Sequence, residues 1–264
     1  MNLDDKQEKH EQEVIDNISQ RGIYLLPNLL TTAALFAGFY SVVAALKGYF
    51  DTAAIAIFIA MIADGLDGRV ARLTNTQSPF GAQYDSLSDM LAFGVAPALV
   101  LYSWTLIHLG KIGWIVAFLY TAGTALRLAR FNTQVNDKKY FQGLPSPAAA
   151  GMMASIVWMG SNYEVDGGVL MLPVAVLTIF VAGLMVSTIR YSSFKNIDFK
   201  GKVPFITVVV AVFIITAVAL EPAEMLFGIF FIYVISGPAI TLWQLRKVRK
   251  QRKLDNRQHK KRMY

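Results

Sequence analysis

Long apolar runs dominate this chain and limit how it can fold. Several stretches of roughly 20 mostly apolar residues follow one another, and each is long enough to cross a bilayer as a helix. Of the 264 residues, 55% are hydrophobic and 16% are charged, whereas ordinary soluble domains have roughly 45–50% and 25%. This composition excludes a soluble enzyme and a disordered chain. The sequence therefore predicts an all-α protein, a polytopic bundle of membrane helices.

Hydropathy predicts about eight transmembrane helices, preceded by a polar segment, residues 1–22, at the cytoplasmic surface or the membrane interface. The predicted spans cover residues 25–46, 51–72, 79–107, 111–131, 146–160, 167–189, 203–220 and 222–244. The fifth is short and rich in Ala, Gly and Met, so a count of six or seven stays open.

The positive charge of the chain lies in its C-terminal tail. From Arg246 onward there are ten Lys or Arg residues and one acid, Asp255, whereas the rest of the chain has 15 basic and 17 acidic residues. A polybasic segment directly after a span is typical of a cytoplasmic edge facing anionic lipid. With an even number of spans, both termini are then cytoplasmic, and most basic residues of the loops share that side. We expect a multi-pass protein of the cell (inner or plasma) membrane, with membrane lipid and no nucleic acid as the tail's partner.

Four aspartates lie within two consecutive predicted spans. Asp64 and Asp67 are three residues apart, and Asp85 and Asp89 are four apart, so each pair shares one helix face. The short polar loop between them predicts an antiparallel hairpin. At a rise of about 1.5 Å per residue, both pairs reach a similar depth just inside the cytoplasmic leaflet.

Four carboxylates at one depth in a membrane need a compensating function. Each charged residue within a span costs at least about 2.5–3.5 kcal/mol, and the four would repel one another. Divalent Mg²⁺ or Mn²⁺ ions take oxygen ligands and bridge to phosphates, so the pattern predicts a two-metal site that clamps a phosphoryl group. Two alternatives stay open: acids paired with nearby arginines, and a cation-coupled transporter.

The stretch DGLDGRVARLTNTQSPFGAQYDSLSD, residues 64–89, resembles the signature of the CDP-alcohol phosphatidyltransferases. Its matching positions are Asp64, Asp67, Gly68, Ala71, Arg72, Gly81, Asp85 and Asp89. The resemblance implies an enzyme that displaces CMP from a CDP-linked lipid with the hydroxyl of a second substrate. It also implies that the four aspartates hold two divalent cations, that Asp89 is the catalytic general base, and that the enzyme is a homodimer.

Other segments narrow the resemblance to bacterial members of the family that use serine as the acceptor alcohol. These segments are residues 27–41, 126–132, 141–151 and 187–202. The resemblance implies CDP-diacylglycerol as donor, L-serine as acceptor and CMP as product. It makes residues 23–202 the catalytic core, followed by two additional membrane helices at 203–244 and the polybasic tail at 245–264. Glycerol 3-phosphate or an inositol phosphate as acceptor is the nearest alternative.

Polar residues near the signature are candidates for substrate binding. The resemblance places one set around the CDP-lipid: Asn28, Thr31, Gly68, Arg72, Ser78 and Gly81. Amide, hydroxyl and guanidinium groups suit a cytosine edge and a pyrophosphate, although helix capping would also explain Asn28 and Thr31.

A second set carries the cations expected for the serine carboxylate or the lipid phosphate. It comprises Arg127, Arg130, Ser146, Arg190 and Lys195. The alternative for these charges is a solvated rim that sets topology, and for Ser146 a plain turn between spans.

Overall fold

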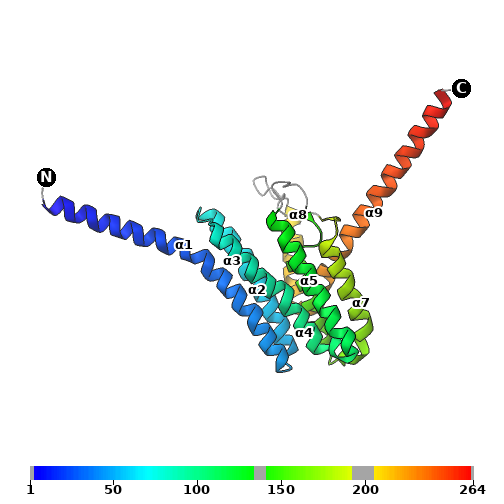
Figure 1. Ribbon diagram of the computed structural model, residues 1–264, viewed down its shortest axis with the longest axis horizontal. Coiled ribbons are helices and arrows are strands. Elements are labelled where there is room, and N and C mark those ends of the chain that lie inside the picture. Colours follow the sequence, from blue (N-terminus) through cyan, green and yellow to red (C-terminus); the bar gives the residue numbers. More distant parts are fainter. Residues whose placement is uncertain (1–2, 134–140, 192–204, 263–264) are drawn as a thin grey trace.

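The computed structural model describes residues 3–133, 141–191 and 205–262, and these fold almost entirely into helices (Figure 1). In chain order the elements are α1 (Leu3–Leu46), α2 (Phe50–Leu73), α3 (Pro79–Asp89), η1 (Met90–Val95), α4 (Ala96–Trp104), η2 (Leu106–Leu109), α5 (Lys111–Thr133), β1 (Phe141–Gln142), α6 (Ser146–Asn162), α7 (Gly167–Val186), β2 (Arg190–Tyr191), α8 (Phe205–Leu220) and α9 (Pro222–Arg262). The predicted all-α class is confirmed.

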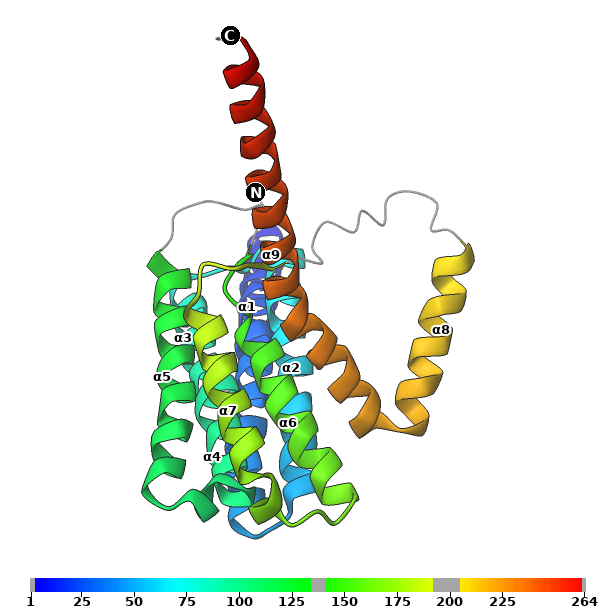
Figure 2. The same ribbon diagram turned by 90° about the vertical axis from the view of Figure 1, so that its right-hand side faces the viewer.

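Within the described residues, five helical segments are long and apolar enough to cross a membrane. They are residues 25–46, 79–104, 111–133, 167–186 and 222–244. The chain is thus a multi-pass membrane protein. Helices α2 and α6 pack within the same bundle, and α8 lies apart from it beside α9 (Figure 2). Among the described residues, each of the eight predicted spans overlaps helical structure, the third one over several consecutive helical segments. The count of eight crossings stays a prediction.

Two helices extend well past their predicted spans. α1 begins at Leu3 and passes through Pro27 without interruption, so the expected boundary at residue 22 lies inside a helix. α9 runs on from the last predicted span to Arg262 and carries the basic tail as a continuation of the same helix. Figure 1 shows both extensions pointing away from the bundle in different directions.

Small residues let the helices approach closely. A Cβ atom on Gly38 of α1 would lie 2.7 Å from the Cα of Ala92, and one on Gly151 of α6 would lie 2.4 Å from the ring of Phe230 in α9. Membrane helices pack through such contacts because lipid provides no hydrophobic drive between them. The core of the bundle is therefore built around alanine and glycine.

The third predicted span is not one regular helix. It consists of α3, a π-helical turn η1 and α4, followed by the 3₁₀ turn η2. Pro97 has no N–H to donate to the carbonyl of Phe93 four residues earlier, and that carbonyl accepts a hydrogen bond of 3.1 Å from the hydroxyl of Tyr120 instead. The π-helical turn begins directly after Asp89, and such turns are frequent at functional sites.

A two-residue antiparallel pair, β1 with β2, was not expected from the sequence. Phe141 pairs with Tyr191, and Gln142 pairs with Arg190. The hydroxyl of Tyr191 also donates a hydrogen bond of 3.0 Å to the carbonyl of Val234 in α9. These contacts join the segment before α6 to the end of α7 and to α9.

Candidate functional site

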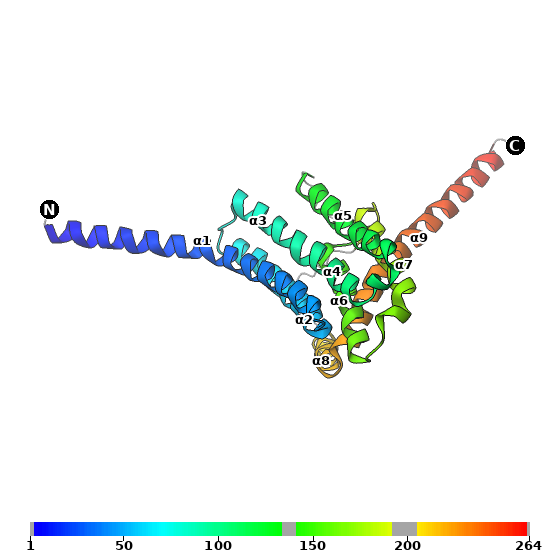
Figure 3. The same ribbon diagram turned by 60° about the horizontal axis from the view of Figure 1, so that its bottom comes forward.

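The loop at residues 74–78 joins α2 to α3. We call this end of the bundle the aspartate end, because the four aspartates lie in the parts of the two helices near the loop. The amide of Thr76 donates a hydrogen bond of 3.0 Å to the carbonyl of Ala71, which closes α2. Ser78 caps α3, accepting a hydrogen bond of 2.9 Å from the amide of Gly81, with Pro79 at the first helical position. This is the start expected from the Ser–Pro pair. α1 packs against both α2 and α3, as Figure 3 shows.

The hairpin brings the predicted aspartates together. Asp64, Asp67 and Asp85 each offer one carboxylate oxygen, and these oxygens all lie within 4.8 Å of one another. The carboxyl group of Asp89 is in hydrogen-bonding contact with that of Asp64. All four side chains therefore belong to one cluster, with Asp89 joined to it through Asp64.

The cluster has the properties of a site for divalent cations. Asp67 is 5% exposed, and the Oδ1 atom of Asp85 is buried without a hydrogen-bond partner among the described residues. A buried carboxylate oxygen without a donor is costly, and a contact between two carboxyl groups needs a proton or a cation between them. An all-oxygen donor set is the one that Mg²⁺ and Mn²⁺ prefer. The residues present fit such an ion.

A cavity of about 410 Å³ opens beside the cluster, between α1, α2 and α3. All six residues predicted to bind the CDP-lipid line it: Asn28, Thr31, Gly68, Arg72, Ser78 and Gly81. Asp67 and Asp85 lie in the same wall. A Cβ atom at Gly81 would lie 3.1 Å from Ser78 Oγ and 3.4 Å from Asn28 Oδ1, so a larger residue would crowd two of the polar groups that face the cavity.

The predicted cationic residues have different surroundings. Arg127 donates a hydrogen bond of 2.8 Å from Nη1 to the Oγ of Ser146, and it lies close enough to Asp89 for their charges to interact. Its Nε atom is buried and has no hydrogen-bond partner among the described residues. The structure thus brings Arg127, Ser146 and the aspartate cluster together.

Arg130 has different hydrogen-bond partners from Arg127. Its Nη1 atom donates to the carbonyls of Val186 and Ser187, at 2.9 and 3.4 Å, and so caps the C-terminal end of α7. Arg190 lies in β2, and Lys195 falls outside the described residues. Of the two arginines of this set whose side chains are described, Arg127 and Arg130, Arg127 is the one that lies close to an aspartate of the cluster.

Some polar contacts near the site were not anticipated. Asn132 of α5 donates a hydrogen bond of 2.8 Å to Ser86 of α3, and Ser88 donates one of 3.1 Å to the carbonyl of Thr31. Both serines lie between Asp85 and Asp89, but their partners are distant in sequence. No spacing along the chain signals such pairs.

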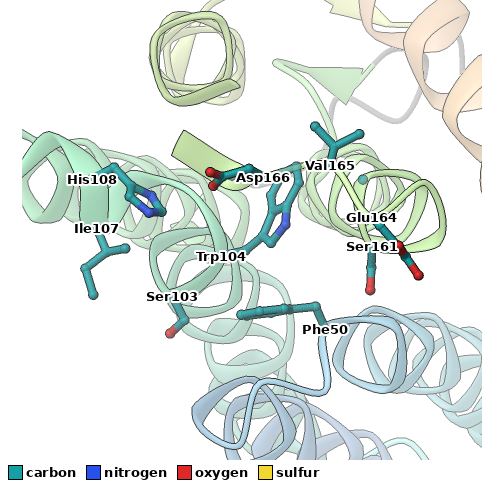
Figure 4. Close-up of a pocket in the computed structure, with 11 residues that line it drawn as sticks. Phe50, Ser103, Trp104, Ile107, His108, Ser161, Glu164, Val165 and Asp166 are labelled. Carbon is teal, nitrogen blue, oxygen red and sulfur yellow. The ribbon is translucent and has the colours of Figure 1, made fainter. Parts of the chain in front are cut away.

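A second cavity, of about 490 Å³, is shown in Figure 4. Its lining residues come from the helix ends opposite those joined by the aspartate hairpin loop. The cavity is lined by residues of the start of α2, the end of α4, η2 and the α6–α7 turn, among them Phe50, Trp104, His108 and Asp166. None of the predicted site residues lines it. This end of the bundle is therefore separate from the aspartate cluster.

Known proteins resemble this chain over most of its length. The family model for CDP-alcohol phosphatidyltransferase matches residues 24–181. A CDP-diacylglycerol–serine O-phosphatidyltransferase of Helicobacter pylori is 39% identical over 214 residues, which cover 80% of this chain and 90% of that protein. The Mycobacterium leprae protein of the same name is 32% identical over 230 residues, which cover 82% of this chain and 74% of that protein.

The resemblance extends to an archaeal protein with a related name. An archaetidylserine synthase of Methanothermobacter thermautotrophicus is 36% identical over 168 residues, which cover 63% of this chain and 69% of that protein. The matched region of the family model contains the aspartate hairpin, the cavity beside it and Arg127. From its aspartate hairpin and this match, the chain belongs to the CDP-alcohol phosphatidyltransferase family.

Proposed function

We propose that this chain is a CDP-diacylglycerol–serine O-phosphatidyltransferase, which transfers the phosphatidyl group of CDP-diacylglycerol to the hydroxyl of L-serine and releases CMP. The observation that carries the proposal is the set of carboxylate oxygens of Asp64, Asp67 and Asp85, within 4.8 Å of one another beside a polar cavity. The names of its relatives, two for serine transfer and one for an archaeal serine lipid, support the acceptor.

Asp64, Asp67, Asp85 and Asp89 would hold two divalent cations, Mg²⁺ or Mn²⁺. When bound, such ions neutralise the charge of a pyrophosphate and of the oxygens on the phosphorus under attack. The buried, unpartnered Oδ1 of Asp85 and the contact between Asp64 and Asp89 support this assignment.

The cavity between α1, α2 and α3 would hold the CDP part of the donor. Asn28 offers an amide for the cytosine edge, and Arg72 offers a guanidinium for a pyrophosphate oxygen. Gly68 and Gly81 leave room for the ligand beside the aspartates. The diacylglycerol part would remain in the lipid at the side of the bundle.

Arg127 would hold the acceptor. Its buried Nε is a donor without a partner among the described residues, and a guanidinium binds a carboxylate through two parallel hydrogen bonds. Ser146 fixes one side of the same guanidinium. Serine bound through its carboxylate at Arg127 would place its hydroxyl toward Asp89.

Asp89 would act as the general base. As the serine oxygen forms its bond to the lipid-side phosphorus, Asp89 accepts the hydroxyl proton, and the bond from that phosphorus to the CMP oxygen breaks. CMP leaves with the electron pair of that bond. The products are phosphatidylserine and CMP.

We further propose that the aspartate end faces the cytoplasm and that the protein lies in the cell membrane as a homodimer. Support for the orientation comes from charge, since basic residues gather at this end of the spans and only Lys47 and Lys111 lie at the opposite turns. The homodimer rests on the resemblance to the family alone.

A CMP-release assay with a panel of alcohols tests the proposal. Purified protein with CDP-diacylglycerol and Mg²⁺ or Mn²⁺ should release CMP with L-serine and much more slowly with glycerol 3-phosphate or an inositol phosphate. A preference for either phosphate would overturn serine as the acceptor. No CMP release with any alcohol, from monodisperse protein, would overturn the reaction itself.

A further inference from the structure

Thr31 of α1 is buried beside the aspartate cluster, and its hydroxyl already has a partner there. The side chain is 4% exposed, and its Oγ1 donates a hydrogen bond of 2.6 Å to Oδ2 of Asp67. The carbonyl of Pro27 is farther away, at 3.1 Å. A hydroxyl has one proton, and 2.6 Å is within the range of a charge-assisted bond to a carboxylate. The proton therefore goes to Asp67 and is not available to a substrate.

The backbone of Thr31 is fixed from the side of α3. Ser88, which is 2% exposed, donates a hydrogen bond of 3.1 Å to the carbonyl of Thr31. Ser88 directly precedes Asp89. A single buried residue of α1 is therefore bonded to α2 at Asp67 and to α3 next to Asp89, so it connects the two helices that carry the aspartates.

We infer that Thr31 is a positioning residue of the metal site, acting through Asp67. Its hydroxyl engages one oxygen of the Asp67 carboxylate and so fixes the rotation of that group, leaving the other oxygen for a cation. Partners of this kind orient metal ligands and commonly change metal affinity by about 10- to 100-fold. This inference rests on the proposed function, since it assumes that the aspartates bind a divalent cation. It replaces the direct contact with CDP that the family resemblance implies for Thr31.

The chain offers a matched control in the next residue. Thr32 donates a hydrogen bond of 2.7 Å to the carbonyl four residues earlier, that of Asn28. Its other partner is the hydroxyl of Tyr84, at 2.9 Å, and not an aspartate. Thr32→Val therefore removes the same group from the same helix and leaves Asp67 untouched.

The test measures Mn²⁺ binding to the full-length, metal-stripped protein in detergent. Either calorimetry or the electron paramagnetic resonance signal of free Mn²⁺ gives the Kd. Thr31→Val keeps the shape of the side chain and removes the hydroxyl, so we expect a Kd for Mn²⁺ about 10- to 100-fold higher. Thr31→Ser should restore most of the affinity, and Thr32→Val should bind as the wild type does. At saturating Mn²⁺, the KM for CDP-diacylglycerol of Thr31→Val should equal that of the wild type.

The outcomes separate this inference from the proposed function. Wild-type Mn²⁺ affinity in Thr31→Val, with affinity lost in Asp67→Asn, would overturn the role of Thr31 and leave the metal site in place. A raised KM for CDP-diacylglycerol with unchanged Mn²⁺ binding would make Thr31 a substrate contact and also overturn it. Equal Mn²⁺ binding by wild type and Asp67→Asn would instead contradict the proposed metal site. If Thr31→Val does not fold, Thr31→Ala compared with Thr31→Ser makes the same test.

Discussion

The hydroxyl of Tyr120 donates a hydrogen bond of 3.1 Å to the carbonyl of Phe93, within the π-helical turn that begins directly after Asp89. Both residues are fully buried. Because Pro97 cannot donate to that carbonyl, the hydrogen bond from α5 supplies the partner that a regular helix would have provided. The position of Asp89 at the end of α3 is therefore coupled to α5.

We expect Tyr120→Phe to destabilise the protein by about 0.5–1.5 kcal/mol, because it removes a buried hydrogen bond to the carbonyl of Phe93. Thermal unfolding in detergent measures the change. Tyr102→Phe, at a partly buried tyrosine of α4, is the control and should have a smaller effect. Equal losses of stability in both variants would show that the hydrogen bond to Phe93 contributes no more than an ordinary tyrosine hydroxyl does.

Asp64→Asn, Asp67→Asn and Asp85→Asn should each reduce CMP release by at least about 100-fold, while the protein stays folded in the membrane. The expected reason is the loss of one oxygen ligand from the proposed metal site, because second-sphere changes alone at metal sites commonly cost about 10- to 100-fold. The control is Asp51→Asn, an exposed aspartate in the first turn of the same helix α2. Turnover like that of the wild type in any of the three variants would remove that aspartate from the metal site.

Arg127→Lys should raise the KM for serine by about 10- to 150-fold, because it would remove the proposed charge-assisted, bidentate contact with the serine carboxylate, worth roughly 1.5–3 kcal/mol. The KM for CDP-diacylglycerol should stay nearly constant. Steady-state kinetics with each substrate varied in turn measures both constants. The reverse pattern would assign Arg127 to the lipid phosphate.

Arg130→Lys should act on stability and not on the KM for serine. The guanidinium of Arg130 caps the carbonyls of Val186 and Ser187 at the end of α7, and losing such a charge-assisted bond costs about 1.5–3 kcal/mol. The measurement is thermal unfolding together with the serine KM. A large rise in that KM with unchanged stability would place Arg130 at the acceptor instead.

Truncation after Gln244 should leave activity in detergent nearly unchanged. The removed part of α9 carries the polybasic tail beyond the last predicted span, where it would contact anionic lipid. Binding to vesicles with and without anionic lipid should distinguish the truncated protein from the full chain. Loss of activity in a monodisperse truncated protein would show that the tail reaches the site.

The sequence predicted the parts of this structure that depend on local pattern. The hydropathy runs predicted helices within a few residues of α2, α5 and α7, and the Ser–Pro pair at residues 78–79 predicted where α3 begins. Helical spacing placed Asp64 and Asp67 on one face of α2, and the short loop brought α3 back toward them. These features depend on the residue pattern within a single helix or on segments that are adjacent in the sequence.

Features that depend on contacts between residues far apart in the chain could not be predicted from the sequence. The π-helical turn after Asp89 precedes Pro97 and accepts a hydrogen bond from the hydroxyl of Tyr120, which lies in another helix. Pairing of β1 with β2 joins two loops that no alternating pattern marks. Arg127 and Arg130 are one turn apart and look equivalent in the sequence. In the structure they differ, because Arg127 contacts Ser146 and Arg130 contacts the end of α7.

The short loop between α2 and α3 also has a consequence for how the site assembles during synthesis. All four aspartates lie within the 26 residues 64–89, and Thr31 precedes them. Contacts between segments so close in sequence cost little loop-closure entropy and form early. The aspartate cluster can therefore assemble as soon as the first three membrane segments are inserted, whereas Arg127 and Ser146 emerge later. A ribosome-bound chain would complete its aspartate cluster before the contact between Arg127 and Ser146 could form.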